Sequence, residues 1–436
     1  MNIEENHTNH TKDKINLNLP FISRYAQKNG GLLTGRLYNL NLYTALQPIY
    51  SLAHKRVVGY EALLRAKDDN SNFINPATVF QMADSAVDEI HLDRLCRYIH
   101  TNNFLAIGDP INWLFLNVSS ETILNGKAYG SYFKELLEAF KFPAHRIVIE
   151  VVEQPIEDNG LLTETINYYK SLGALIAIDD FGAGYSNFDR IWTIKPDIVK
   201  LDRSFIVRAS EQKRVKEMLS GIVSLLHQAG SLVLLEGVET LEQAMMAVAS
   251  GVDFVQGFYF GRPFTELKHP FKHFEEFDSL FDQHKALSAL ESSRLQGIIK
   301  QYSVVFTDVI EKLKNNQSLE QAAEKMLLNS SVVRCYQIGT DGVQIGNTIV
   351  SKTYRSSNDN RFKPLEDAKN ADWFRRHYLE RAIMHPEQLQ ITRPYLSIAG
   401  AHMCITLSMK FSIGADNIVL CCDIGLPMIA ASKKEH

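Results

Sequence analysis

The sequence predicts an α/β fold: an imperfect (β/α)8 barrel, a long helix and a small α+β domain. Two observations predict the barrel. Short apolar runs alternate with amphipathic helical stretches from about residue 40 to 265, and roughly eight such units occur. The length of 436 residues leaves room for a second domain. We expect a mobile tail over 1–22, the barrel over 23–268, a connecting helix over 269–317 and the second domain over 318–430.

The composition is that of an ordinary globular protein, with 45% apolar and 22% charged residues. The net charge of −4 gives no whole-chain electrostatic argument for binding a nucleic-acid polymer or a membrane. No apolar run is long enough to cross a bilayer. The five cysteines are odd in number and form no C-x-x-C pair, so we expect reduced thiols in a cytoplasm. Adjacent Cys421 and Cys422 are expected on opposite faces of a strand.

The predicted barrel strands are nearly continuous apolar runs, which is typical of parallel strands buried on both faces. Only a few residues, Ser51 to Lys55, separate the first two runs. That gap is too short for a helical crossover, so these two strands should form an antiparallel hairpin. The runs are YTALQPIY (43–50), RVVGYE (56–61), WLFLNV (113–118), RIVIEV (146–151), ALIAID (174–179), DIVKLD (197–202), SLVLLE (231–236) and DFVQG (253–257).

Apolar residues then recur at helical spacing from Phe274 to Leu313, which predicts one long helix or two helices broken near Gly297. An apolar stripe of this kind often pairs with a second copy, so we expect a homodimer. Further elements indicate the small domain: a capping box over 318–321, a strand–turn–strand over 331–350, a helix around Trp373–Met384, and strands over 403–411 and 417–424.

Polar residues stand at the end of almost every predicted barrel strand. In a (β/α)8 barrel these ends converge on one mouth, where active sites lie. Carboxylates this close would repel one another unless divalent cations lay between them, and oxygen ligands favour Mg²⁺ or Mn²⁺ over zinc. Taken singly, any such carboxylate could instead cap a helix. The residues are Gln47, Glu61, Asn117, Glu150, Asp179 with Asp180, Lys200 with Asp202, Glu236 and Gln256.

Two carboxylate-bridged metal ions, about 3.5–4 Å apart, suit phosphoester hydrolysis. Adjacency of Asp179 and Asp180 would let one carboxylate bridge both ions. Lys200 is expected either to orient the attacking water or to neutralise developing phosphorane charge, and Glu236 either to bind metal or to accept the proton. Arg65 is a candidate phosphate contact.

A series of motifs resembles the EAL family of cyclic di-GMP phosphodiesterases over about residues 40–265. One three-letter motif would be weak, but the full series falls in the family's order and spacing. The motifs are QP (47–48), EALLR (61–65), NVS (117–119), EVVE (150–153), DDFGAGYSN (179–187), KLD (200–202), EGVE (236–239) and QGFYFGRP (256–263).

The resemblance implies hydrolysis of one phosphodiester bond of cyclic di-GMP, giving linear pGpG, with two Mg²⁺ or Mn²⁺ ions. It implies metal ligands at Glu61, Asn117, Glu150, Asp179 and Asp180. It gives Lys200 and Glu236 the water-activating and proton-accepting roles, with Gln256 supporting the water and metal site. Nucleotide contacts fall at Gln47, Leu64, Arg65, Asp202 and Pro263, and Glu153 anchors the loop 180–188. The departures, Ala183, Asn187 and Leu235, remove no ligand; Leu235 should point away from the mouth if Glu236 points into it.

The C-terminal region resembles a PAS/Cache-type sensor module, as in the YkuI group of the EAL family. Trp373, Tyr378, Arg393, Tyr395 and Asp423 are candidates for the lining of a pocket for an unidentified small molecule. The alternative is that the aromatic residues belong to the core and the charged ones are caps or surface pairs. His377 and His385 are expected on the surface.

Three functions compete. The first is an active, metal-dependent cyclic di-GMP phosphodiesterase regulated by its C-terminal domain. The second is a receptor that binds cyclic di-GMP without cleaving it and signals through the long helix. The third, a barrel enzyme acting on a sugar phosphate, would make the EALLR and DDFG motifs coincidences.

Overall fold

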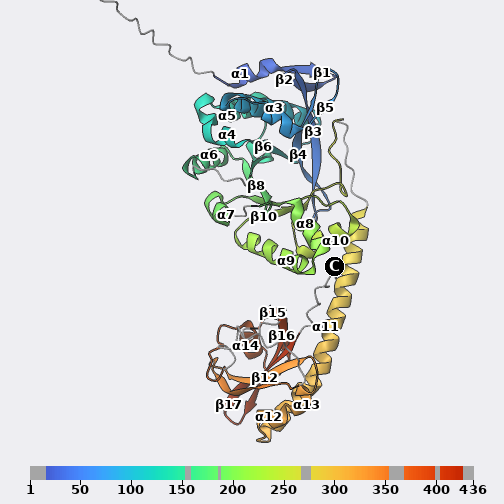
Figure 1. Ribbon diagram of the computed structural model, residues 1–436, viewed down its shortest axis with the longest axis vertical. Coiled ribbons are helices and arrows are strands. Elements are labelled where there is room, and N and C mark those ends of the chain that lie inside the picture. The colour runs from blue at the N-terminus through green and yellow to red at the C-terminus, as the bar shows by residue number, and fades with distance from the viewer. Residues whose placement is uncertain are drawn as a thin grey trace, which may run out of the picture. The chain divides into compact units, whose positions relative to one another are not determined.

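The computed structural model describes residues 16–152, 159–184, 188–266, 276–352, 368–397 and 403–425. The chain divides into two compact units, 1–286 and 287–436, and the division falls within one long helix. Each unit has its own sheet and its own helices (Figure 1). None of the helices described is both long and apolar enough to cross a membrane.

The first unit is built on a closed barrel of eight strands, which confirms the predicted fold class. Strand β3 pairs antiparallel with both of its neighbours, β4 and β11, whereas the other pairs are parallel. The barrel is therefore imperfect in the predicted way. Around the barrel the strands are β3 (Leu40–Ser51), β11 (Phe254–Val255), β10 (Leu232–Leu235), β9 (Ile198–Leu201), β8 (Leu175–Phe181), β7 (Ile147–Val152), β6 (Trp113–Val118) and β4 (Arg56–Lys67).

Helices follow most of the strands and form the outer layer of this unit (Figure 1). They are α2 (Pro76–Gln81), α3 (Ala86–Ala106), α4 (Ser120–Asn125), α5 (Tyr132–Phe140), α6 (Asn159–Ser171), α7 (Phe188–Ile194), α8 (Arg203–Glu211), α9 (Lys213–Gln228) and α10 (Leu241–Ser250). The 3₁₀ turns are η1 (Ser23–Tyr25), η2 (Gly126–Tyr129) and η3 (Ala144–Arg146). Strands β1 (Ala26–Asn29), β2 (Leu32–Leu37) and β5 (Phe73–Ile74) extend the sheet beyond the barrel.

The end of the expected mobile tail is packed in the structure. Leu17 and Ile22 are fully buried against the first unit, and α1 (Leu19–Ile22) begins at Asn18, whose side chain accepts a hydrogen bond from the amide of Phe21. The polar composition of the preceding residues obscured these two apolar anchors. Residues 1–15 lie outside the described part of the chain.

Side chains alternate between two apolar layers along the parallel strands. On β10, Leu234 packs inside the barrel, whereas Val233 and Leu235 pack between the barrel and its helices. This confirms that Leu235 points away from the barrel interior. The alternation directs the next residue, Glu236, toward the mouth.

A buried histidine in α3 makes the stability of this unit sensitive to acid. Nδ1 of His100 lies 2.8 Å from Oγ1 of Thr44, and burial lowers the pKa of His100 from 6.5 to about 3. Because the unfolded chain takes up this proton first, stability falls as pH drops below the unfolded pKa. Between about pH 7 and pH 5 the loss should reach about 2 kcal/mol.

We therefore expect the His100→Gln variant to lack that part of the acid destabilisation. Urea unfolding of both proteins at the two pH values measures it. The control is His377→Gln, whose imidazole is exposed and should leave the pH dependence unchanged. Parallel pH dependence of wild type and His100→Gln would contradict the assignment.

The second unit is a six-stranded sheet covered by helices on both faces. The strand order is β13 (Gln344–Val350), β12 (Val332–Gly339), β17 (Asp416–Gly425), β16 (Met403–Ile413) and β14 (Gln390–Ile391), with β15 (Tyr395–Leu396) also paired to β16. One face packs on the second half of α11 (Glu276–Lys314), with α12 (Leu319–Ala322) and α13 (Glu324–Leu327). The other face packs on α14 (His377–Met384).

Two sequence expectations about this unit are resolved. Helix α11 is continuous through Gly297, because a glycine inside a helix costs only about 1 kcal/mol and does not remove a hydrogen bond. Cys421 and Cys422 lie on opposite faces of β17, as expected. All five cysteines are buried and unpaired.

Candidate active site

The predicted carboxylates converge on the barrel mouth. Glu61 extends from β4, Glu150 from β7 and Asp179 from β8, and the pairing register aligns these strand ends. Glu150 is completely buried, and Glu61 and Asp179 are nearly so. Burying three carboxylates together requires positive charge close to them.

Lys200 supplies that charge from β9. Its Nζ lies 2.6 Å from Oε1 of Glu150, 2.8 Å from Oδ1 of Asp179 and 2.7 Å from Oε1 of Glu236. Oε1 of Glu61 lies farther away, at 3.7 Å. One ammonium therefore faces four carboxylates, and Lys200 itself is 1% exposed.

This single cation does not balance the site. Burial raises the pKa of Glu150 well above its usual range, against the opposing effect of Lys200. Burial also raises the pKa of Glu236 to about 8 and, with help from Asp179, that of Asp180 to about 6. Burial alone would lower the pKa of Lys200, but the surrounding carboxylates outweigh it and raise that pKa. The site therefore favours additional positive charge, either protons or metal ions.

The oxygen atoms are arranged in two overlapping groups that could each hold a cation. Carboxylate oxygens of Glu61, Glu150 and Asp179 lie within 4.8 Å of one another, and so do those of Asp179, Asp180 and Glu236. Asp179 belongs to both groups. Among the described residues, Oε2 of Glu150 is buried without a hydrogen-bond partner. An orphaned, buried carboxylate oxygen beside hard oxygen donors fits a divalent cation.

A local irregularity explains how neighbouring aspartates reach the same mouth. In a regular strand Asp179 and Asp180 would point to opposite faces. The pairing of β8 with β9 instead shifts register between Ile178 and Phe181, and Asp180 adopts a left-handed backbone with φ of 55°. The amide of Asp180 donates a 3.0 Å hydrogen bond to Oδ1 of Asp179. The bulge redirects Asp180, which is the usual role of bulges beside functional sites.

Two amides border the same group of acids. Nε2 of Gln256 donates a 2.7 Å hydrogen bond to Oε2 of Glu61, and Nδ2 of Asn117 donates a 3.3 Å bond to Oε1 of that residue. Both amides therefore hold the Glu61 carboxylate in place. The side-chain oxygen of Asn117 remains a predicted metal ligand.

Gly257, directly after Gln256, must remain glycine. Its φ is 155°, and a Cβ there would lie 2.1 Å from the carbonyl oxygen of Val238. Because backbone cannot move aside as a side chain can, we expect Gly257→Ala to destabilise the barrel by about 3 kcal/mol. Urea unfolding tests this. The control, Gly221→Ala in α9, meets nothing within 4 Å and should stabilise by about 0.5–1 kcal/mol. Equal effects of the two variants would contradict the argument.

The residues expected to contact nucleotide have differing environments. Gln47 pairs with Glu61 across β3 and β4, and its Nε2 donates a 3.3 Å bond to the carbonyl of Gly261. Arg65 is half-buried, and burial lowers its pKa. Leu64 is buried and Pro263 half-buried. These nucleotide contacts remain predictions.

Asp202 caps a helix, which is the alternative role that the sequence left open for any single carboxylate at a strand end. Its side chain caps α8 by accepting a 2.9 Å hydrogen bond from the amide of Ser204. A contact with nucleotide remains a prediction for this residue. Glu153 and residues 185–187 of the predicted loop lie outside the described residues.

In the second unit the structure brings together only some of the predicted pocket residues. The Asp423 carboxylate is fully buried and accepts hydrogen bonds from Arg334 Nε at 2.6 Å and from Thr406 Oγ1 at 2.7 Å. Tyr395 Oη lies 2.5 Å from the same Thr406 hydroxyl. The sequence analysis missed Arg334 and Thr406, which both pair with Asp423 across neighbouring strands. The available signal was Arg334, a charged residue within a largely apolar strand.

Among the other predicted residues of that pocket, Tyr378 is linked to this network by a hydrogen bond to Tyr336, whose hydroxyl donates a 3.4 Å bond to Oδ1 of Asp423. Trp373 donates from Nε1 to Oε1 of Gln344 at 3.0 Å, and Tyr378 is buried in the core under α14. Arg393 is exposed. His377 and His385 are exposed, as expected.

Comparison with known proteins identifies a family for the first unit of the chain. The sequence pattern that defines the EAL domain matches residues 33–263. Cyclic di-GMP phosphodiesterase RocR of Pseudomonas aeruginosa is 29% identical over 229 residues, covering 50% of this chain and 57% of RocR. The uncharacterized EAL-domain protein YkuI of Bacillus subtilis is 26% identical over 351 residues, covering 77% of this chain and 82% of YkuI.

The crystal structure of Bacillus subtilis YkuI, in complex with substrate c-di-GMP and calcium, shares the fold with a TM-score of 0.76 at 22% identity. The alignment covers 89% of this chain and 97% of that one. The chain spans between 30% and 57% of the length of three curated phosphodiesterase relatives that it matches. Because the EAL pattern spans more than half of the 436 residues, the chain belongs to the EAL domain family.

Proposed function

We propose that this protein is a metal-dependent phosphodiesterase that hydrolyses cyclic di-GMP to linear pGpG. The observation that carries the proposal is the buried cluster of acids around Lys200, in which Asp179 belongs to two groups of oxygen donors. The named relatives supply the substrate, because RocR is called a cyclic di-GMP phosphodiesterase and YkuI was crystallised with c-di-GMP.

Divalent cations fit the residues present, and Glu61, Asn117, Glu150, Asp179 and Asp180 would hold them. When bound, a pair of Mg²⁺ or Mn²⁺ ions supplies an activated water and stabilises charge on the transferred phosphoryl group. Oxygen-only donors and the absence of histidine and cysteine from the two groups of carboxylates favour these hard cations over zinc.

Four side chains of the protein then have separate roles in the proposed reaction. Lys200 keeps its proton, since its carboxylate neighbours raise its pKa, and its ammonium holds Glu150, Asp179 and Glu236 in position. Glu236 receives the proton of the attacking water on a carboxylate oxygen in its ionised form, which nearby cations favour against the burial that raises its pKa to about 8. Arg65 and Gln47 orient the phosphate and nucleotide at the mouth.

A direct assay tests this function. Purified protein is incubated with Mg²⁺ or Mn²⁺ and cyclic di-GMP, and products are separated by liquid chromatography. We expect pGpG to form with either metal and no product after chelation. Tight binding of cyclic di-GMP without turnover in either metal would instead identify the receptor alternative. Failure to bind the nucleotide at all would contradict both.

As part of the same proposal, the second unit regulates the activity of the first. The protein acts in a reducing cytoplasm, which suits its five unpaired thiols. The unit has an independent core and a buried Arg334–Asp423 pair on its α14 face. Mass spectrometry of molecules that co-purify with the full chain would identify a ligand.

We also propose a homodimer that forms along α11. Leu287, Leu290 and Val304 are 55%, 67% and 72% exposed, and Leu290 and Val304 are spaced by two heptads. Apolar residues at this spacing favour helix pairing. Sedimentation should give about twice the 49.4 kDa mass of one chain, and Leu290→Glu/Val304→Glu should give a monomer. Ser292→Glu, on a different side of α11, should remain dimeric; a monomeric wild type would contradict the proposal.

A further inference from the structure

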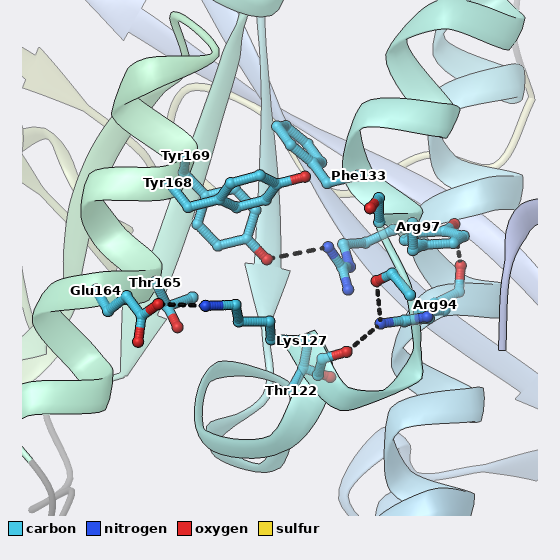
Figure 2. Close-up of a pocket in the computed structure, with 13 residues that line it drawn as sticks. Arg94, Arg97, Thr122, Lys127, Phe133, Glu164, Thr165, Tyr168 and Tyr169 are labelled. Atoms are coloured by element: carbon cyan, nitrogen blue, oxygen red, sulfur yellow. Dashed lines mark hydrogen bonds and ion pairs between the residues drawn. The ribbon is translucent and has the colours of Figure 1, made fainter. Parts of the chain in front are cut away.

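A cavity of about 270 Å³ lies in the outer helical layer of the first unit, apart from the barrel mouth. Helices α3, α5 and α6 and the turn η2 surround it (Figure 2). Its lining includes Arg94, Arg97, Lys127, Tyr168 and Tyr169. None of the described residues assigned above to metal or nucleotide lines it.

The cavity carries one positive charge that no carboxylate balances. Arg97 forms an ion pair with Asp93, and Lys127 forms one with Glu164. Arg94 has no carboxylate at ion-pair distance in the part of the chain that the structure describes. Its guanidinium instead donates to uncharged carbonyl oxygens, those of Leu17, Tyr129, Gly126 and Gly130.

The two guanidinium groups are also incompletely satisfied. Arg94 and Arg97 are each 2% exposed, and neither Nε has a hydrogen-bond partner among the described residues. Nη1 of Arg97 points toward Tyr169, whose hydroxyl lies 3.5 Å away, at the limit of a hydrogen bond (Figure 2). Burial, with added repulsion from Arg97, lowers the pKa of Arg94 to about 10. An anion placed here would therefore relieve an existing electrostatic cost.

The remaining walls are aromatic. The rings of Phe133 and Tyr169 pack edge to face with centroids 4.9 Å apart, and Tyr168 lies beside them on α6 (Figure 2). The Tyr132 ring centroid lies 5.1 Å from the guanidinium carbon of Arg94 and 5.2 Å from that of Arg97. The volume is smaller than the roughly 300–1,000 Å³ of pockets for drug-sized ligands, so a single ring with a small substituent fits.

We propose that this cavity is a binding site for a small aromatic monocarboxylate. The carboxylate lies beside Arg94 and Arg97, and the ring lies against Tyr168 and Tyr169. A monoanion matches the single unbalanced charge, whereas a phosphate dianion would bring a second charge without a partner. The site is independent of cyclic di-GMP chemistry at the barrel mouth.

Calorimetry on the full chain tests the site, with 4-hydroxybenzoate as the probe and the uncharged 4-hydroxybenzamide as its matched control. We expect the carboxylate to bind at least about tenfold more tightly than the amide. No binding of the carboxylate at about 10 mM, or equal binding of the two compounds, would overturn the proposal.

Variants locate the binding. Asp93→Asn/Arg97→Met removes both members of the buried pair together, which avoids leaving either charge alone, and should weaken 4-hydroxybenzoate binding about tenfold or more. Tyr168→Ala removes a wall that is 38% exposed and should also weaken binding, which keeps the test decisive if the double variant does not fold. Lys134→Gln, on the exposed side of α5, should bind as wild type does. Unchanged affinity in folded Tyr168→Ala would place the probe elsewhere and overturn the assignment.

Discussion

Replacing Glu61 with alanine should reduce turnover of cyclic di-GMP by about 1,000-fold or more. Loss of one preorganised electrostatic group commonly costs about 10²–10³ in kcat, and Glu61 both faces Lys200 and belongs to a group of three metal-binding oxygens. Chromatographic detection of pGpG under saturating Mn²⁺ measures the effect.

The fold of this variant should survive. Alanine removes an acid from a site with excess negative charge, although it leaves Gln256 without its carboxylate partner. We therefore expect a melting temperature close to that of wild type. Glu121→Ala, at an acid on the exposed side of α4, is the control and should keep full turnover. Activity in Glu61→Ala within tenfold of wild type would remove Glu61 from the metal site.

Replacing Lys200 with methionine should cost about 3–5 kcal/mol of folding stability as well as activity. The substitution keeps an unbranched side chain one atom shorter than that of lysine but leaves buried acids without their common cation. Breaking a buried pair on one side carries about this cost. Urea unfolding in the absence of divalent metal measures the loss.

The loss should grow with pH. Without Lys200 the buried carboxyls hold protons that the unfolded chain releases at ordinary carboxyl pKa values, so the folded state binds more protons and stability falls as pH rises. We expect a larger deficit at about pH 8.5 than at about pH 6, and partial recovery with Mn²⁺. Lys213→Met, at an exposed lysine of α9, should change stability little at either pH. A deficit independent of both pH and metal would show that Lys200 acts by packing alone.

The barrel and the acids of its mouth could be predicted because two strong regularities coincide. Apolar runs such as RIVIEV and SLVLLE mark strands buried on both faces, and each of these two runs carries a glutamate at or next to its end. Closure of the barrel converts that one-dimensional pattern into convergence in space, so Glu61, Glu150 and Asp179 meet although they are far apart in the chain. The short gap before Arg56 likewise predicted the antiparallel hairpin of β3 and β4, which the structure contains.

Other features depend on three-dimensional detail that the pattern does not contain. The position of Lys200 at the centre of four acids follows from the length and direction of one side chain, and the left-handed Asp180 follows from a bulge. The i,i+4 pair Asp93–Arg97 in α3 is buried, and the sequence analysis singled out neither residue. In the second unit, where the motifs are weaker, the structure was needed to link Arg334 to Asp423.

The occupancy of the barrel mouth by metal tests the central claim most directly. Crystals soaked in Mn²⁺ and measured at the manganese absorption edge should show two anomalous peaks within coordination distance of Glu61, Asn117, Glu150, Asp179 and Asp180, with Lys200 still bound to the surrounding acids. Crystals that take up no manganese at this mouth, while their acids pair only with Lys200, would contradict a metal-dependent phosphodiesterase.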